Sequence, residues 1–206
     1  MSSEPVPESV PDDELLVRIA TGDAAAFTSL FRRRQADVYR VALLMTGLPA
    51  AAEDVTQEVF MVVMRDAARY EAGRSTVTAW LCGIARNHAR RRLEREGRIV
   101  PLHDDGEAET PGTAVHPDPI GDLSNTERLN ALRQAVLSLP LRYREVVVLC
   151  DLEEISYADA AAALDCAVGT VRSRLHRARA LLAAKMRVRL APREAPATKK
   201  ITRVLA

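Results

Sequence analysis

Aromatic residues are scarce in this chain. Phenylalanine, tyrosine and tryptophan make up 4% of its 206 residues, although 48% of the chain is hydrophobic. Strands favour aromatic and β-branched side chains, whereas the abundant alanine and leucine favour helices. The composition therefore argues against a β-sandwich and predicts an all-α protein, with enough apolar residues for one sizeable core or two small ones.

Cysteine is also scarce. The chain has three cysteines, Cys82, Cys150 and Cys166, which are odd in number, far apart and not arranged as CxxC. This spacing does not support a disulfide framework or a zinc site, and it fits a reducing compartment. We expect neither a metal nor another cofactor.

Targeting and membrane signals are missing as well. The first eleven residues, "MSSEPVPESVP", are acidic and proline-rich, without the basic and apolar regions of a signal peptide. No apolar run approaches the length of a membrane span. We therefore expect residues 1–11 to form a disordered tail on a cytoplasmic protein that does not insert into a membrane. The net charge of +1 indicates no class of partner.

Apolar residues recur at helical spacing through the first half of the chain. The stretch "TGD" at 21–23, the pair Gly47 and Pro49, and the loop "EAGRST" at 71–76 interrupt this pattern. Ser75 or Thr76 is available as an N-cap for the helix that follows. These breaks predict a helical bundle over 12–97, with helices near 12–20, 27–45, 51–70 and 77–96.

A change of composition separates this bundle from the rest of the chain. Residues 99–124 carry four prolines, three glycines and six acidic residues, with no lysine or arginine. Such a segment is too long for a loop inside a compact domain, and its composition is typical of an extended linker. The sequence therefore predicts two helical domains, 12–97 and 125–190, joined by a long flexible acidic linker over 98–124. A basic tail follows at 191–206.

The second domain has the pattern of a helix-turn-helix. We expect one helix from about Asn125 to Pro140 and another over "YREVVVLCDL". The stretch "SYADAAAAL" then opens with Ser156, and Asp159 lies three residues later as in a capping box. Three residues, "DCA", separate this short helix from a second, basic one. A short helix, a tight turn and a basic helix are typical of DNA-binding proteins.

The basic helix begins with "VGTVRSRLHRAR", and no acidic residue occurs from Gly169 to Arg189. Its apolar residues recur at i, i+4, i+7 and i+11 and predict a buried stripe of Val171, Leu175, Ala178 and Leu182. The remaining side chains are then free to contact bases and phosphates. A merely solvated basic face is the alternative. The candidate DNA-binding residues are Thr170, Arg172, Ser173, Arg174, His176, Arg177 and Arg179.

Two blocks of sequence resemble one known family. The pattern around "AAEDVTQEVFMVV" and "WLCGIARN" resembles region 2 of the extracytoplasmic-function (ECF) sigma factors of bacterial RNA polymerase. The stretch "LPLRYREVVVLCDLEEISYADAAAALDCAVGTVRSRLHRARALL" resembles their region 4. The resemblance covers about 12–95 and 129–182. It implies a protein that binds core RNA polymerase, directs it to specific promoters and assists promoter melting.

The resemblance also assigns sites in the first domain. Asp54, Gln57 and Glu58 lie at i, i+3 and i+4 and predict one polar helix face. In the family this face binds the β′ clamp helices of the polymerase, and region 4 meets the β flap. A plain solvated acidic face is the alternative.

The helix after the loop carries the residues that the family would place at the minus-ten promoter element. Trp80 is a possible stacking platform, but its register with Ile84 favours a core position. Arg91 stands where the family often has an acidic residue, which leaves the base preference open. The candidate minus-ten residues are Arg74, Trp80, Arg86, Asn87, Arg90 and Arg91.

The resemblance implies a further partner and a role for the linker. An anti-sigma factor is a typical partner, and the acidic linker would enter the polymerase cleft as a phosphate mimic or act as a passive tether.

This chain departs from the family pattern at two positions of the turn. Asp165 and Ala167 stand where glycine and proline are common, and aspartate tolerates the left-handed geometry that such a turn needs.

Two other classes of function fit the sequence less well than a sigma factor does. A free-standing helix-turn-helix regulator with an N-terminal interaction domain is the main alternative. An enzyme finds little support, because His88, His103, His116 and His176 are scattered and the chain has no glycine-rich phosphate loop, HExxH or GxSxG motif.

Overall fold

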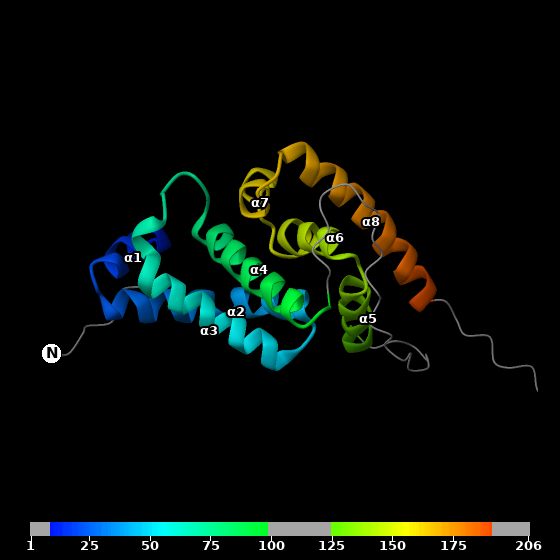
Figure 1. The fold of residues 1–206 in the computed structure, drawn as a ribbon, viewed down its shortest axis with the longest axis horizontal. Coiled ribbons are helices and arrows are strands. Elements are labelled where there is room, and N and C mark those ends of the chain that lie inside the picture. Colours follow the sequence, from blue (N-terminus) through cyan, green and yellow to red (C-terminus); the bar gives the residue numbers. More distant parts are fainter. Residues whose placement is uncertain (1–8, 99–124, 191–206) are drawn as a thin grey trace, which may run out of the picture.

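The computed structural model describes residues 9–98 and 125–190, and within them every regular element is helical (Figure 1). Residues 99–124 of the predicted linker, the basic tail at 191–206 and residues 1–8 of the predicted N-terminal tail lie outside this part of the chain. The elements are α1 (Asp12–Ala20), α2 (Ala24–Thr46), α3 (Pro49–Asp66), the 3₁₀ turn η1 (Ala67–Arg69), α4 (Val77–Arg95), α5 (Asn125–Leu137), α6 (Leu141–Val146), the π-helical turn η2 (Val147–Leu152), α7 (Tyr157–Leu164) and α8 (Val168–Leu190).

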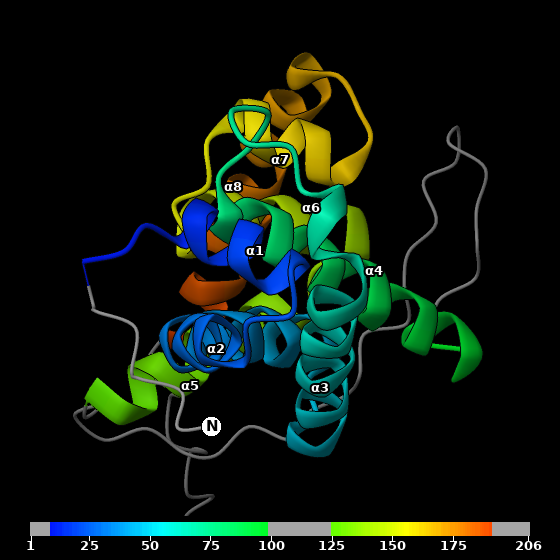
Figure 2. The same cartoon turned by 90° about the vertical axis from the view of Figure 1, so that its left-hand side faces the viewer.

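Helices α1 to α4 form the N-terminal unit. Helices α2, α3 and α4 pack against one another, and α1 closes one end of the bundle (Figures 1 and 2). The buried side chains come from all four helices and include Leu16, Leu30, Val59 and Leu81. The predicted helical bundle is therefore confirmed.

Local signals set the ends of these helices. The Asp23 carboxylate accepts hydrogen bonds from the backbone N–H groups of Ala25 and Ala26 at 2.8 and 3.0 Å, and so caps α2. The bond from Ala26, followed by one from Arg18, lowers the pKa of Asp23. Gly47 ends α2 at a φ of 79°, which glycine adopts without strain. Thr76 caps α4, since its hydroxyl accepts from the Ala79 N–H at 3.2 Å.

The predicted third helix and the predicted N-terminal tail differ from the structure, and α3 ends at Asp66 rather than near Tyr70. The third helix begins at Pro49 rather than Ala51, because proline suits the first helical position, where no N–H is needed. The predicted disordered tail is wrong for residues 9–11. The Val10 carbonyl accepts from the Arg33 guanidinium at 2.6 Å, and the Val10 side chain packs against the core.

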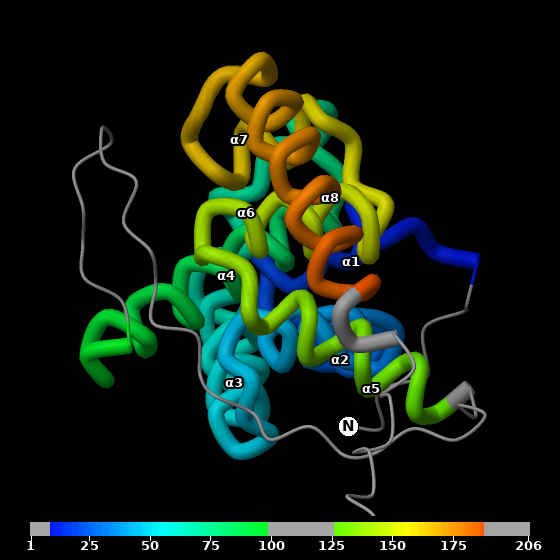
Figure 3. Tube along the Cα trace, turned by 90° about the vertical axis from the view of Figure 1, so that its right-hand side faces the viewer, coloured from blue at the N-terminus to red at the C-terminus, as the bar shows by residue number. Residues whose placement is uncertain are grey.

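Helices α5 to α8 form the C-terminal unit. The Ser156 hydroxyl accepts from the Asp159 N–H at 3.1 Å and donates to the Asp159 carboxylate at 2.9 Å, as the capping pattern indicated. Asp165 ends α7 at a φ of 50°, so aspartate does adopt the left-handed conformation here. Helix α8 then runs along the outside of the unit (Figure 3). The helix-turn-helix is therefore present as predicted.

The predicted helix over 143–152 is not one regular α-helix. It begins as α6 and continues as the π-helical turn η2, which ends at Leu152. Glu154 follows with a φ of 54°. This irregular segment points Asp151 toward α8 and Glu153 toward the N-terminal unit, where both carboxylates form ion pairs.

The two units are not separate bodies. Helix α4 packs against α7, and α2 packs against α5, α6 and η2 (Figures 1 and 2). The Arg144 guanidinium donates to the Met45 carbonyl at 2.7 Å and also to the Leu137 carbonyl, which ties the end of α2 to the second unit. Burial lowers the pKa of Arg144 to about 10. A single hydrophobic core joins both units, which the sequence did not predict.

Candidate functional site

Helix α8 presents a basic surface to solvent. Arg172, Ser173, His176 and Arg177 are exposed along its outer face. The opposite face is anchored by Val171, Leu175 and Ala178, which are fully buried, while Leu182 packs against their edge. The buried stripe is therefore confirmed. Thr170 and Arg174 are half-buried between the two faces.

Arg179 differs from its neighbours because it already has a partner. Its guanidinium binds the Asp151 carboxylate through two hydrogen bonds, of 2.5 and 3.0 Å, and this pairing raises the pKa of Arg179. The bond joins α8 to η2. Arg179 therefore braces the helix in this conformation, and any contact with phosphate would compete with Asp151.

A second candidate surface lies on α3. Asp54 and Glu58 face the last turns of α4, where Arg92 donates to Asp54 at 2.6 Å and His88 lies 2.6 Å from Glu58. The pairing with Asp54 raises the pKa of Arg92. Even so, the side chains of Asp54 and Glu58 remain 56% and 42% exposed. Helix α4 thus supports an acidic face that stays open to a partner.

An apolar groove adjoins this acidic face, and sequence reasoning missed it. Met61 and Met64 are each 61% exposed on α3 and continue the helix face of Gln57 at i+4 and i+7. Beneath them Phe31 and Phe60 pack edge to face with ring centroids 4.7 Å apart. The groove between α2 and α3 has a volume of about 650 Å³. Extending the predicted polar face by two turns would have found it.

The predicted minus-ten residues fall into three environments. Arg74, Asn87 and Arg91 are exposed. Arg90 is half-buried and donates to Glu94 at 2.8 Å. Trp80 is also half-buried and packs against the core, and its ring centroid lies 5.5 Å from that of Tyr70. This placement agrees with the core position that the register of Trp80 with Ile84 favoured.

Arg86 does not share the exposed basic face predicted for it. Its guanidinium is buried between the two units and donates to the Glu145 carboxylate of α6 at 2.5 Å. It also donates to the side-chain oxygen of Asn87 at 2.9 Å. The helical register placed Arg86 among the polar residues of α4. At this position, however, α4 faces the C-terminal unit and not solvent. A contact between Arg86 and DNA requires the units to separate.

A small cavity lies where the 70–76 loop, α4 and α7 meet. Its volume is about 280 Å³, and Arg69, Tyr70, Trp80 and Asn87 contribute to its lining together with Ala162 and Ala163 of α7. Aromatic rings, an amide and guanidinium groups are the groups that proteins use to hold an unstacked base and its phosphate. The cavity is large enough for a single planar ring system.

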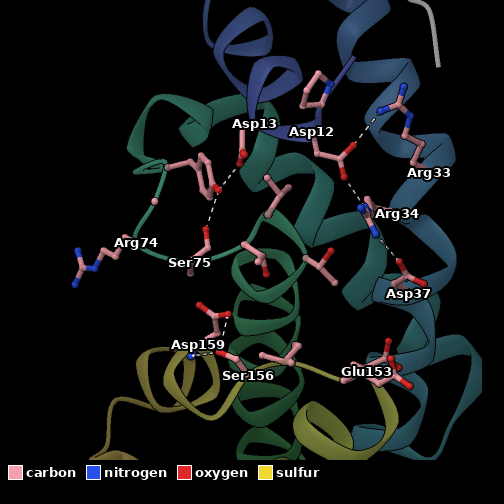
Figure 4. A pocket seen from close by; sticks show the side chains of 18 of the residues that line it. Asp12, Asp13, Arg33, Arg34, Asp37, Arg74, Ser75, Glu153, Ser156 and Asp159 are labelled. Atoms are coloured by element: carbon pink, nitrogen blue, oxygen red, sulfur yellow. Dashed lines mark hydrogen bonds and ion pairs between the residues drawn. The ribbon is translucent and has the colours of Figure 1, made fainter. Parts of the chain in front are cut away.

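A larger polar cleft, of about 1150 Å³, separates α1 and α2 from the segment that precedes α7 (Figure 4). Several of its charges are already paired, because Asp12 binds both Arg33 and Arg34, and Arg34 also binds Asp37. Tyr70 donates to Asp13, and burial together with that carboxylate raises the pKa of Tyr70. These ion pairs and the Tyr70 hydrogen bond tie α1 to α2 and to the 70–76 loop.

Residues 9–98 and 125–190 contain no cluster of histidine, cysteine and acidic side chains that would hold a metal ion. Over the same stretches, no helix combines the length and the apolar character needed to cross a bilayer.

Comparison with known families matches both units. Residues 30–99 match the family described as Sigma-70 region 2, and residues 129–182 match Sigma-70, region 4. Together the two matches cover more than half of the chain. The N-terminal match includes the acidic face of α3, and the C-terminal match includes the helix-turn-helix.

The individual proteins that this chain resembles are sigma factors as well. The ECF RNA polymerase sigma factor SigE of Mycolicibacterium smegmatis is 41% identical over 78% of this chain and 62% of its own length, so this chain spans less than two thirds of that relative. The ECF RNA polymerase sigma-E factor of Escherichia coli is 36% identical over 84% of this chain and 92% of its own length. The solved complex of the sigma factor RpoE with the anti-sigma factor NepR from Bartonella quintana is similar with a TM-score of 0.60 and 28% identity, over 79% of this chain and 97% of that chain.

Proposed function

The chain belongs to the extracytoplasmic-function sigma factors of RNA polymerase, and we propose how its two units divide the work of that family. Residues 12–97 bind core polymerase and the minus-ten element, and residues 125–190 bind the minus-thirty-five element. The chain itself carries out no covalent chemistry, because nucleotidyl transfer belongs to the polymerase. A free-standing regulator is not favoured, since such a protein has no need of a region 2.

The polymerase-binding surface is the exposed face of α3. Asp54, Gln57 and Glu58 provide its polar part, and Met61 and Met64 extend it over the apolar groove. Carboxylates on a rigid helix attract basic residues of a partner helix, here the β′ clamp helices. Exposed methionines beside phenylalanines add apolar area that a docked helix would bury. Charge sets the orientation and apolar burial supplies affinity.

The minus-ten surface is the junction of α4 with the 70–76 loop. The cavity beside Tyr70, Trp80 and Asn87 has the lining for one base taken out of the melted strand. Arg74 and Arg91 are exposed near it and would hold the backbone phosphates. Stacking on an aromatic ring contributes about 1–3 kcal/mol per base, so one pocket helps to keep the strands apart.

The minus-thirty-five surface is the outer face of α8. Arg172, Ser173, His176 and Arg177 are exposed near the start of the helix and reach base edges in a major groove. Thr170 and Arg174 lie at the edge, where phosphate contacts fix the register. The same unit meets the β flap, which places α8 upstream of the active centre.

An anti-sigma factor is the remaining partner that we propose. The similar RpoE chain was solved with such a protein bound. The acidic and apolar face of α3 is the surface that an inhibitor would cover in order to exclude polymerase. Competition between a candidate inhibitor and core polymerase for the chain tests this assignment.

The observation that best supports the assignment is the open acidic face of α3 with its apolar neighbours. Its test is binding of the purified chain to core polymerase, compared between the natural sequence and Asp54→Arg combined with Glu58→Arg. The double variant should lose the complex while its circular dichroism stays helical. Unfolding of the double variant would instead show that the two carboxylates are structural, and undiminished binding would remove them from the interface.

A further inference from the structure

We propose that Asp151 increases the promoter specificity of the chain by holding Arg179 of α8 away from the phosphate backbone of DNA. This inference rests on the proposed function, because it assigns a new role within the minus-thirty-five surface. Asp151 itself lies outside α8, on the π-helical turn η2. It is therefore a positioning residue, which acts on DNA through Arg179.

Arg179 shares one side of α8 with two residues of the proposed base-reading set. It follows Arg172 at i+7 and His176 at i+3, and all three side chains are exposed. The N-terminal residues of a recognition helix contact the bases, whereas Arg179 lies about 10 Å further along the helix axis than Arg172. An arginine at that distance from the base contacts is placed to meet the phosphates that flank them.

Asp151 already occupies this guanidinium with two hydrogen bonds. The Nε of Arg179 donates to one carboxylate oxygen of Asp151 at 3.0 Å, and Nη2 donates to the other at 2.5 Å. Two bonds to one carboxylate fix the plane of the guanidinium as well as its position. The side chains of Arg179 and Asp151 remain 55% and 25% exposed, so the pair lies at the surface that DNA would approach.

Tyr157 is a second residue that holds Arg179. It begins α7 and is 37% exposed. The hydrogen bond with Asp151 does most to raise the pKa of Arg179, and a hydrogen bond with Tyr157 raises it further. Arg179 is therefore held by both η2 and α7, the two elements that precede α8 in the chain. Its guanidinium has a fixed position before DNA arrives.

Such a pair affects non-specific binding more than base recognition. Binding to DNA of any sequence depends on cations that neutralise phosphates. Paired with Asp151, Arg179 adds no net charge to the surface, and the carboxylate repels an approaching phosphate. The base contacts proposed for Arg172, Ser173 and Arg177 do not involve this pair. Non-specific binding therefore loses more than promoter binding, and the ratio of the two affinities rises.

Binding of the full chain to a labelled duplex of random sequence tests the proposal without polymerase. Asp151→Asn keeps the size of the side chain, removes its charge and releases Arg179. It should bind the duplex more tightly at low salt, and the slope of log affinity against log salt should steepen by about 0.9 for one added phosphate contact. Its advantage should then shrink by about 3.5-fold when the salt concentration rises roughly fourfold. An unchanged affinity and slope would overturn the proposal.

Two further variants separate the pair from net charge. Asp151→Glu keeps the carboxylate and should bind the random duplex as weakly as the natural sequence does. Glu154→Gln removes the same charge from an exposed position of the same segment, and the salt slope should stay unchanged. Equal strengthening by Asp151→Asn and Glu154→Gln would show an effect of net charge alone and would overturn the proposal.

A double-mutant cycle shows whether Asp151 acts through Arg179. Asp151→Asn and Arg179→Gln break the same pair, so a purely structural role would change DNA binding in the same direction in both. The proposal instead predicts tighter binding to the random duplex for Asp151→Asn and weaker binding for Arg179→Gln. When Arg179→Gln is already present, Asp151→Asn should not increase the salt slope, because no guanidinium remains to be released. An equal increase in both backgrounds would overturn the proposal.

Promoter specificity itself is measured with the holoenzyme. In competition between a promoter duplex and the random duplex, Asp151→Asn should lower the preference for the promoter, and an unchanged preference would overturn the proposal. The proposed function fails separately, if the natural sequence gives no specific transcript with core polymerase. The polymerase-free measurements on Asp151 and Arg179 still decide whether the pair restrains phosphate binding.

Discussion

Arg86 of α4 and Glu145 of α6 form a buried ion pair, with 2.5 Å between the guanidinium Nε and the carboxylate Oε1. The two residues are 59 positions apart and belong to different sigma regions. One residue of the predicted minus-ten surface is therefore engaged within the protein itself. We therefore expect stability and DNA binding to be coupled through this residue.

Removal of Glu145 should be costly. Glu145→Ala leaves the buried Arg86 guanidinium without its carboxylate, and the loss of one partner of a buried pair costs about 3–5 kcal/mol. Separation of the units can relieve part of that cost. We expect a clearly lower free energy of unfolding in urea for Glu145→Ala and a smaller loss for Glu145→Gln, which keeps an acceptor. Equal stability of all three chains would contradict a buried pair.

Charge reversal on α3 should weaken the polymerase complex specifically. Glu58→Arg places a cation beside His88 and on the face proposed for the clamp helices. Glu14→Arg makes the same charge change on an exposed position of α1 and serves as the control. Titration of core polymerase with labelled protein should show weaker binding for Glu58→Arg than for the natural sequence. Glu14→Arg should bind as the natural sequence does. Equal weakening by both variants would indicate a general charge effect.

The apolar groove can be tested separately from the charges. Met64→Glu should weaken the polymerase complex with little change in thermal stability, because this side chain is mostly exposed and few core contacts are lost. Val17→Glu on α1 is the matched control, since Val17 is similarly exposed but lies outside the groove. Undiminished polymerase binding by Met64→Glu would restrict the interface to the acidic face.

Arg177 and Arg179 of α8 should have different roles. Arg177→Ala removes an exposed side chain, and discrimination of the minus-thirty-five element should fall by about 1–3 kcal/mol if it makes a bidentate base contact. Arg179→Ala should instead lower the thermal stability of the C-terminal unit, because Asp151 loses its partner. Competition binding of the holoenzyme on promoter variants and thermal unfolding measure the two effects. An unchanged base preference in Arg177→Ala would remove that residue from the readout.

The buried thiol of Cys82 and the half-buried thiol of Cys150 predict a dependence of stability on alkaline pH. Burial raises the pKa of Cys82 from 9.0 to about 12 and that of Cys150 to about 11. Between the unfolded and folded values the native chain binds more protons, so the free energy of unfolding falls as the pH rises through this window. Cys82→Ala should make that decline shallower. Rapid alkylation of Cys82 in the native chain near neutral pH would contradict a buried, protonated thiol.

Local features of the fold could be predicted from the sequence. The bounds of α1, the caps at Thr76 and Ser156, and the buried stripe of α8 all depend on residues within a few positions of one another. Periodicity and capping chemistry encode such features directly. The division into two helical units followed from the composition of residues 99–124, and the helix-turn-helix followed from the capping pattern, the short turn and the basic helix.

Features that depend on distant residues could not be predicted. The register of α4 identifies Arg86 as polar but does not show that Glu145 faces it across another unit. The π-helical turn that positions Glu153 follows from packing rather than from a sequence signal. Arg179 joins the basic face by register, and only the fold reveals Asp151 beside it. The helix faces that carry the candidate residues could thus be placed from the sequence, whereas the state of single residues could not.

Promoter-specific initiation tests the central claim most directly. The chain is added to core polymerase that lacks any sigma factor, and transcripts from genomic promoter fragments are mapped in the absence of an inhibitor. Discrete start sites that depend on the chain are expected, and Asp54→Arg combined with Glu58→Arg should abolish them. The absence of a stable complex and of any specific transcript would contradict this expectation.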